Sequence, residues 1–197
     1  IMCSFPMLDI KEGGKLHIIH SIIDNDGSTG PVASLSGPFG EKKGEWENVI
    51  IRNGGRAGID LSGGASLEMN KCKIRGNKGD GILATSKSSI KLVGCAIERN
   101  DGFGIRFPSP CKADLFRCTL EDNTKGVVGK VPNCGITSSG NVAIVKTIPD
   151  RGIPGFKFSK RNNKGEIGDC ELPIPRTIAR PTNSQNQPAG QAPATKK

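Results

Sequence analysis

A spacing of 23 residues recurs through the middle of the sequence and constrains the fold more than any other feature. Three cysteines, two isoleucines and a leucine, and three asparagines each follow it: Cys72, Cys95, Cys118, Ile74, Ile97, Leu120, Asn77, Asn100 and Asn123. Two further aliphatic columns keep the same step, Leu67-Ile90-Ala113 and Met69-Leu92-Leu115. A fixed period of this length is typical of stacked structural repeats. We therefore expect one short unit, used several times.

Within one unit, apolar residues alternate with polar ones over short stretches. Leu67 and Met69 are followed by Cys72 and Ile74, and then by a Gly-Asn turn at 76–77. Such alternation predicts strands, and no window shows the 3.6-residue period of a long helix. Three short strands and three turns in about 23 residues make one coil of a parallel β-helix. Stacked coils, about 4.8 Å apart, bury a continuous apolar column that a single coil cannot bury alone.

The period continues beyond these three units. Trp46 to Leu61 matches an earlier coil, and Leu16 to Ile23 matches the one before it. Gly27 to Lys43 is interpreted as a longer loop between coils, and Val142 to Ile144 as the last strand. The prediction is an all-β, right-handed, single-stranded parallel β-helix of about five or six coils. Its expected divisions are an N-terminal cap or lead-in at 1–15, the β-helix at 16–148, an extended basic Pro-containing segment at 149–180 and a low-complexity, disordered tail at 181–197.

The repeats resemble those of the pectate-lyase-like superfamily, and most closely those of β-helical F-box and SHC SH2-domain-binding proteins. The motif reads CKIRGNKGDGI from Cys72 and CAIERNDGFGI from Cys95, while CTLEDNTKGV from Cys118 is one residue short. The resemblance covers about 16–145 and implies the fold. It does not imply one function, because the same repeat serves lyases, hydrolases, adhesins and adaptors.

The in-register columns favour structural roles. One thiol per coil is unlike the close pairs that bind zinc, so the cysteine column is interpreted as small buried side chains. The asparagine column is interpreted as turn residues that bond one another and the backbone. Charged residues also stack, with Glu68, Lys91 and Asp114 in one column and Arg52, Arg75, Glu98 and Glu121 in another. These columns are expected to fix the strand register on a solvated face.

Catalytic residues, metal sites and cofactors are not predicted. Hydrolases of the resembled superfamily use two or three aspartates on adjacent coils. Here Asp80, Asp101 and Asp122 occupy common turn positions, so no such cluster is expected. Trp46 stands alone and tyrosine is absent, so an aromatic platform for sugars is not expected either. A carbohydrate-active lyase or hydrolase, or a carbohydrate-binding domain, remains the alternative.

Most of the net charge of +9 lies in the C-terminal part, where residues 146–197 carry ten Lys and Arg against four Asp and Glu. A uniformly basic nucleic-acid surface is therefore not indicated, and no apolar run is long enough to span a membrane. The favoured function is a non-catalytic interaction or scaffold module of a larger assembly, which binds protein chains with an acidic surface. The cysteine pattern favours an intracellular, cytoplasmic location. The candidate partner-binding residues are Phe156, Lys157, Phe158, Lys160, Arg161, Arg176 and Arg180.

Overall fold

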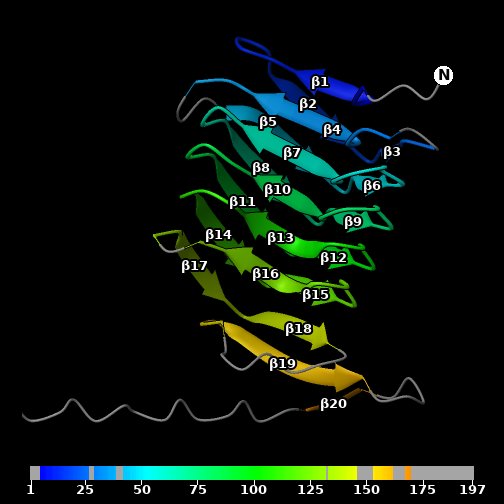
Figure 1. Ribbon diagram of the computed structural model, residues 1–197, viewed down its shortest axis with the longest axis vertical. Helices are drawn as coiled ribbons and strands as arrows, with labels where there is room; N and C mark the ends of the chain where they lie inside the picture. The colour runs from blue at the N-terminus through cyan, green and yellow to red at the C-terminus, as the bar shows by residue number, and fades with distance from the viewer. Residues whose placement is uncertain are drawn as a thin grey trace, which may run out of the picture.

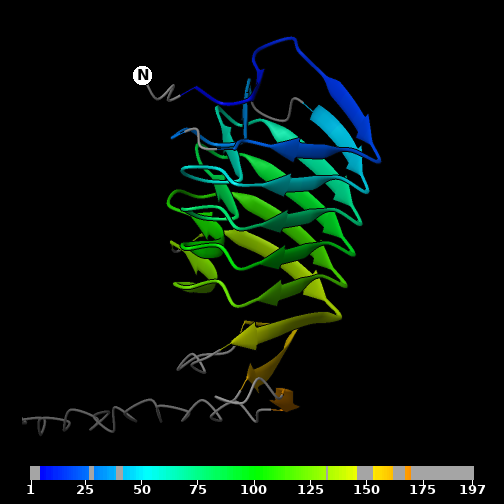
Figure 2. The ribbon, with the colours of Figure 1, turned by 90° about the vertical axis from the view of Figure 1, so that its right-hand side faces the viewer.

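Three sheets run the length of a parallel β-solenoid (Figures 1 and 2). The computed structural model describes residues 5–26, 29–38, 42–131, 133–145, 153–161 and 167–169. Sheet A contains β1 (Leu8–Ile10), β4 (Ala33–Ser36), β7 (Ile59–Ser62), β10 (Ile82–Ala84), β13 (Phe103–Phe107) and β16 (Gly126–Lys130). Sheet B contains β2 (Leu16–Ile19), β5 (Lys42–Glu47), β8 (Ser66–Asn70), β11 (Ser89–Val93), β14 (Lys112–Phe116) and β17 (Gly135–Ser139).

Sheet C contains β3 (Ile22–Asp24), β6 (Ile50–Arg52), β9 (Lys73–Arg75), β12 (Ala96–Glu98), β15 (Thr119–Glu121), β18 (Asn141–Val145), β19 (Phe156–Arg161) and β20 (Ile167–Asp169). Each coil contributes one strand to each sheet, and the strands of successive coils pair in parallel. β20 differs, because it pairs with β19 in the antiparallel direction. These strands confirm the predicted fold class and the count of about six coils.

The repeat spacing sets the register between coils. Ile74 is the Cα partner of Ile97, which in turn is the partner of Leu120. In the three-residue strands of sheet C, only the middle side chain points inward, so Ile74 is fully buried between the half-buried Lys73 and Arg75. The predicted one-residue shortening of the third unit is wrong, because Phe103 pairs with Gly126 and Ile105 with Val128, still 23 residues apart.

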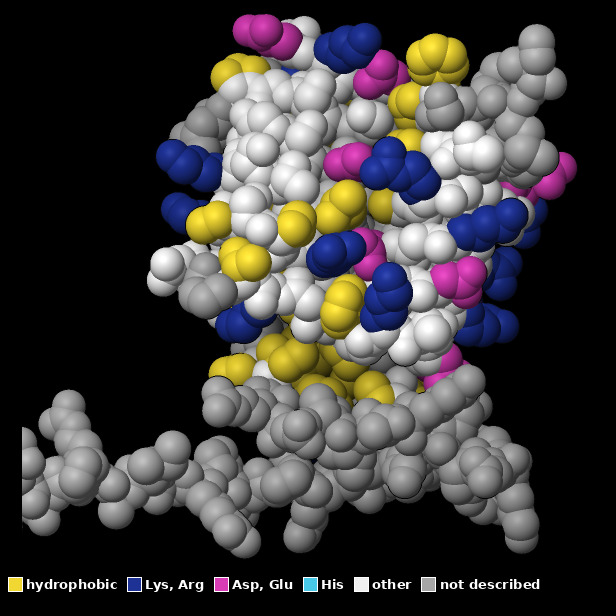
Figure 3. Space-filling model, viewed as in Figure 1, with side chains coloured by type: hydrophobic (Ala, Val, Ile, Leu, Met, Phe, Trp, Pro, Cys, Tyr) yellow, Lys and Arg dark blue, Asp and Glu magenta, His cyan; other side chains and the backbone are white. Residues whose placement is uncertain are grey.

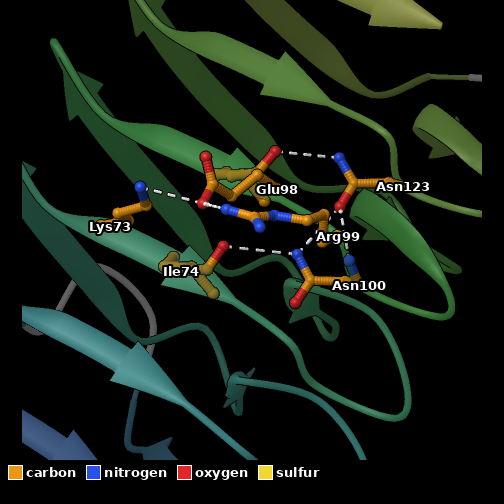
Figure 4. A network of polar contacts seen from close by, with 7 residues as sticks. Lys73, Ile74, Glu98, Arg99, Asn100 and Asn123 are labelled. Carbon is orange, nitrogen blue, oxygen red and sulfur yellow. Dashed lines mark hydrogen bonds and ion pairs between the residues drawn. The ribbon is translucent and has the colours of Figure 1, made fainter. Parts of the chain in front are cut away.

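The turn from sheet C to sheet A contains a ladder of asparagine amides, of which Figure 4 shows Asn100 and Asn123. Asn77 Nδ2 donates to Asn100 Oδ1 at 2.8 Å, and Asn100 Nδ2 donates to Asn123 Oδ1, also at 2.8 Å. The same oxygens accept the backbone N–H groups of Asn77 and Asn100. Because Asn77 and Asn100 are almost fully buried, the ladder satisfies polar groups that the turn removes from water.

The solenoid extends beyond the predicted boundaries at both ends. β1 lies within the predicted lead-in at 1–15, yet it pairs with β4 and begins sheet A. The predicted loop at 27–43 contains β4, which hides Ala33 and Leu35. Past the predicted end at 148, β19 pairs with β18 and continues sheet C. These strands were missed because Gly, Ser and Pro in the flanking residues obscure a short apolar alternation. The predictions for 181–197 lie outside the described residues.

Among the residues that the structure describes, no helix is long and apolar enough to cross a membrane.

Candidate functional site

A hollow of about 250 Å³ lies beside sheet A, over the turns that lead into β7, β10 and β13. We call it the sheet A hollow. Both signs of charge surround it: the cations are Arg56, Lys78, Arg106 and Lys125, and the carboxylates are Asp60, Asp80 and Asp101. Figure 3 shows the same mixture of basic and acidic side chains across this face of the molecule. The sequence spacing did not reveal that these three aspartates would gather around one hollow.

Two stacked glycines form part of the hollow. Gly79 and Gly102 occupy equivalent turn positions, since the Gly102 N–H donates to the Gly79 carbonyl at 2.7 Å. Lys125 follows in the next coil, where its N–H donates to the Gly102 carbonyl at 3.0 Å. A Cβ at Gly102 would approach the Asp80 backbone nitrogen to 2.6 Å, so the close stacking of the turns requires glycine here. The two glycines thus let the backbones of successive turns pack closely between the exposed Arg56 and Lys125.

Asp80 is the buried carboxylate of the hollow, and it serves the fold. Its Oδ1 accepts the Phe103 backbone N–H at 2.7 Å, and its Oδ2 lies 3.7 Å from the Arg106 guanidinium. Only 7% of the residue is exposed. A carboxylate bound to the backbone of the next coil ties two turns together, and it is poorly placed to leave that amide for a substrate.

Asp60 is chemically the most unusual group of the hollow. It lies half-buried on β7, and in the described part of the chain it forms neither a hydrogen bond nor an ion pair. Burial raises the pKa of its carboxyl above the ordinary value, and the nearby Arg56 guanidinium only partly offsets this. Its direct neighbours in the outward column of sheet A are Ser34 and Leu83, and Arg106 follows Leu83. The column therefore does not supply a second carboxylate beside Asp60.

The hollow also lacks the groups that hold a metal or stack on a sugar. Within the described ranges, no three His, Cys, Asp or Glu side chains are arranged to bind a metal ion. The described residues that line the hollow include no aromatic side chain. What the arrangement offers is a patterned set of charges suited to binding.

Comparison with known proteins places the chain in a family with this fold. Residues 7–153 match the family described as a right-handed β-helix region. The chain belongs to the right-handed β-helix family. A solved structure titled pectate lyase Pel9A is similar to this β-helix with 14% sequence identity and a TM-score of 0.46, over 71% of this chain. The chain spans 34% of that structure's length.

No curated protein matches the sequence. The right-handed parallel β-helix repeat predicted from the sequence is confirmed, whereas the closer resemblance to β-helical F-box and SHC SH2-domain-binding proteins stays a prediction.

The cysteine column of the β-helix lies in the core. The Sγ atoms of Cys72, Cys95 and Cys118 lie within 3.2–3.5 Å of carbonyl oxygens of the preceding coil. Hydrogen bonding with the thiols of Cys118 and Cys72, together with burial, raises the pKa of Cys95 far above its ordinary range. Since the thiolate is the reactive and metal-binding form, the raised pKa and the burial of Cys95 both disfavour reaction or metal binding at this position.

The predicted partner-binding aromatics of the tail lie in the core instead. Phe158 is 3% exposed and Phe156 is 8% exposed, so the prediction that these two contact a partner is wrong. The prediction was wrong because the neighbouring basic residues suggested an exposed segment. In β19 the side chains alternate, so the two Phe side chains point inward and Lys157 is exposed. Lys160 and Arg161 lie on β19, where the structure describes only their backbone. Arg176 and Arg180 lie outside the described residues.

Replacing Asp60 with asparagine should raise the free energy of unfolding at neutral pH by about 0.5 kcal/mol. The raised pKa means that ionised Asp60 disfavours the folded state. The gain should shrink as the pH falls towards about 4, where the carboxyl of the unfolded chain also becomes protonated. Urea unfolding across this range measures the effect, and Asp114→Asn on the exposed face of sheet B is the control. If the gain in the free energy of unfolding for Asp60→Asn does not change with pH, the raised pKa of Asp60 is contradicted.

Proposed function

We propose that this right-handed β-helix is a non-catalytic protein-interaction module, a scaffold within a larger intracellular assembly, and that the sheet A hollow receives its partner. The observation that carries the proposal is the commitment of Asp80 to the Phe103 amide and to Arg106. Acid–base hydrolysis of a glycoside uses two free carboxyl groups. Because Asp80 is engaged in the fold and the neighbours of Asp60 in its column are Ser34 and Leu83, the hollow is better suited to recognition than to catalysis.

The charge pattern of the hollow supports a protein partner. Arg56, Lys78 and Lys125 are exposed, and the carboxylates of Asp60 and Asp101 stand near them. Complementary patterns of both signs are typical of protein interfaces, where they set orientation and exclude wrong partners. A partner with acidic residues facing Arg56 and Lys125 would complement the charge of these two cations, which lie on either side of the stacked glycines.

Several other outward charges form ion pairs within the solenoid, which also supports a scaffold. Lys42 and Lys91 both pair with Glu68 on sheet B, at 3.0 and 3.4 Å. Arg52 pairs with Asp24 on sheet C, at 2.7 Å. Such pairs between neighbouring coils help to keep the sheet faces in register. We further propose that the basic residues after 148 anchor the module to the same assembly.

The test compares two triple variants that change the net charge equally. The hollow variant carries Arg56→Ser, Lys78→Ser and Lys125→Ser, and the control carries Lys15→Ser, Lys112→Ser and Lys130→Ser. All six residues are exposed. Affinity capture from the source cells, with quantitative mass spectrometry, should recover a partner chain with the parent and the control but at least about tenfold less with the hollow variant. Equal recovery with both variants would exclude the hollow as the interface.

A carbohydrate-active enzyme is the second candidate function, and the raised pKa of Asp60 favours it. A carboxyl that holds its proton at higher pH is suited to general acid catalysis. Incubation with pectic and other acidic polysaccharides, with and without Ca²⁺, separates the two functions. Release of products by the parent protein, abolished by Asp60→Asn, would overturn the scaffold proposal.

A further inference from the structure

A second hollow lies at the corner where sheet C turns towards sheet A. Its volume is about 250 Å³, and its lining consists of Arg52, Asn53, Arg75, Gly76 and Arg99. We call it the arginine groove. Three guanidinium groups from three successive coils line it, and the described lining residues include no carboxylate.

Two of the arginines are bound by acidic residues that are not part of the groove's lining. Arg52 Nε donates to Asp24 Oδ2 at 2.7 Å. Arg99 donates to Glu98 Oε1 at 2.6 Å, and Lys73 reaches the same oxygen at 2.9 Å (Figure 4). Burial raises the pKa of Glu98, but the hydrogen bonds from Lys73 and Arg99 outweigh burial, so the pKa lies below the ordinary value. Glu98 is therefore ionised and already engaged at neutral pH.

Arg75 differs from both. It is the Cα partner of Arg52 on one side and of Glu98 on the other. Yet the carboxylate of Glu98 is bound to Lys73 and Arg99, and in the described part of the chain Arg75 forms neither a hydrogen bond nor an ion pair. Like charges on neighbouring strands destabilise a sheet. The register thus places Arg75, whose guanidinium donors are all free, beside the cation Arg52.

The turn leaves space in front of Arg75. Gly76 adopts a φ of +64°, and a Cβ placed there would lie 3.7 Å from the nearest atom, Asn53 Oδ1. The Gly76 N–H donates to the Arg99 carbonyl at 3.1 Å, so Arg99 occupies the equivalent position in the next coil. The bare glycine therefore lies between the side chains of Asn53 and Arg99, and it opens the groove beside Arg75.

We infer that the arginine groove binds a tetrahedral oxyanion, a phosphate or sulfate group. A guanidinium presents a planar fork of donors that matches two oxygens of such a group. Asn53 Nδ2 already donates to Asp24 Oδ1 at 2.7 Å, so the donors come from the arginines. The whole fork of Arg75, with the N–H groups of Arg52 and Arg99 that their acids leave unbound, can serve three or four oxygens, whereas a carboxylate offers only two. The anion would neutralise Arg75 and remove its repulsion with Arg52. This inference concerns a different surface from the sheet A hollow, and it stands or falls independently of the proposed function.

The test measures binding by isothermal titration calorimetry in buffers without phosphate or sulfate. Inorganic phosphate and O-phosphoserine are titrated separately, to distinguish a free anion from an ester, with acetate as the planar comparison. The parent should bind at least one of the first two, with a Kd of about 1 mM or tighter. Arg75→Gln should weaken that binding at least about tenfold. Arg117→Gln, at an exposed position of the opposite corner, should change it less than about twofold.

Several outcomes would overturn the inference. Equal binding by the parent and Arg75→Gln would place the anion elsewhere, and absence of binding by both phosphate compounds would remove the site. Acetate binding as tight as phosphate would show that tetrahedral geometry is not recognised. Thermal melting without phosphate provides the folding check, since Arg75→Gln should melt no lower than the parent. If it does melt lower, the milder Arg75→Lys keeps the charge but loses the fork, and it should still weaken phosphate binding.

Discussion

Replacing Phe158 with alanine should lower the free energy of unfolding by about 3 kcal/mol. Phe158 is 3% exposed and is the Cα partner of the fully buried Ala143, so it continues the inward column of sheet C into the last parallel strand. It also lies beside Phe156, with ring centroids 6.4 Å apart. The truncation removes the whole buried ring beside the small Ala143 and leaves a cavity in the core.

Urea unfolding followed by circular dichroism measures this effect, and Lys157→Ala on the exposed side of the same strand is the matched control. The control should change the free energy of unfolding by less than about 0.5 kcal/mol. Equal effects of the two substitutions would show that β19 does not pack on the core in solution. The same result would restore the interpretation of this segment as an extended ligand.

Replacing Gly81 with alanine should cost about 3 kcal/mol, because one methyl group would meet atoms that cannot move away. A Cβ at Gly81 would lie 2.6 Å from the Gly104 carbonyl oxygen and 3.0 Å from Asn100 Nδ2. The carbonyl oxygen belongs to the backbone of the next coil, and the amide nitrogen belongs to the asparagine ladder. Relief of the clash therefore requires two coils to separate or the ladder to break.

Gly135→Ala is the control for this substitution. A Cβ at Gly135 would meet only Lys112 Cγ, at 3.9 Å, and the residue needs no left-handed backbone. Thermal and urea unfolding of the two variants should therefore differ clearly. If Gly81→Ala is as stable as Gly135→Ala, the coils are less closely stacked at this turn than the structure indicates.

The fold could be predicted from the sequence because stacking makes the same demand at every coil. Ile74 and Ile97 recur because each fills the same inward position, and Asn77 and Asn100 recur because each amide needs a partner in the next coil. The glycine that precedes Ile82 also recurs, at 58 and 104. Only the structure gave its reason, which is the approach of the next carbonyl.

The hollows could not be predicted in the same way. The repeat relates only equivalent positions, whereas Asp60 and Asp80 come from a strand and a turn that are not equivalent. The free state of Arg75 was also hidden, because its register partner Glu98 looks like an ion-pair partner in the sequence. Glu98 pairs with Lys73 and Arg99 because of the directions of these side chains, which the spacing alone does not specify.

The arrangement of hydrogen bonds also has a mechanical consequence. The chain runs around the solenoid axis, while the bonds between strands, such as those joining β9 to β12 and β15, run along it. A force that pulls on one end of the chain therefore acts first on the bonds that hold the outermost coil to the next one. Under tension the molecule would lengthen in increments of one coil, each about 75 Å of extended chain.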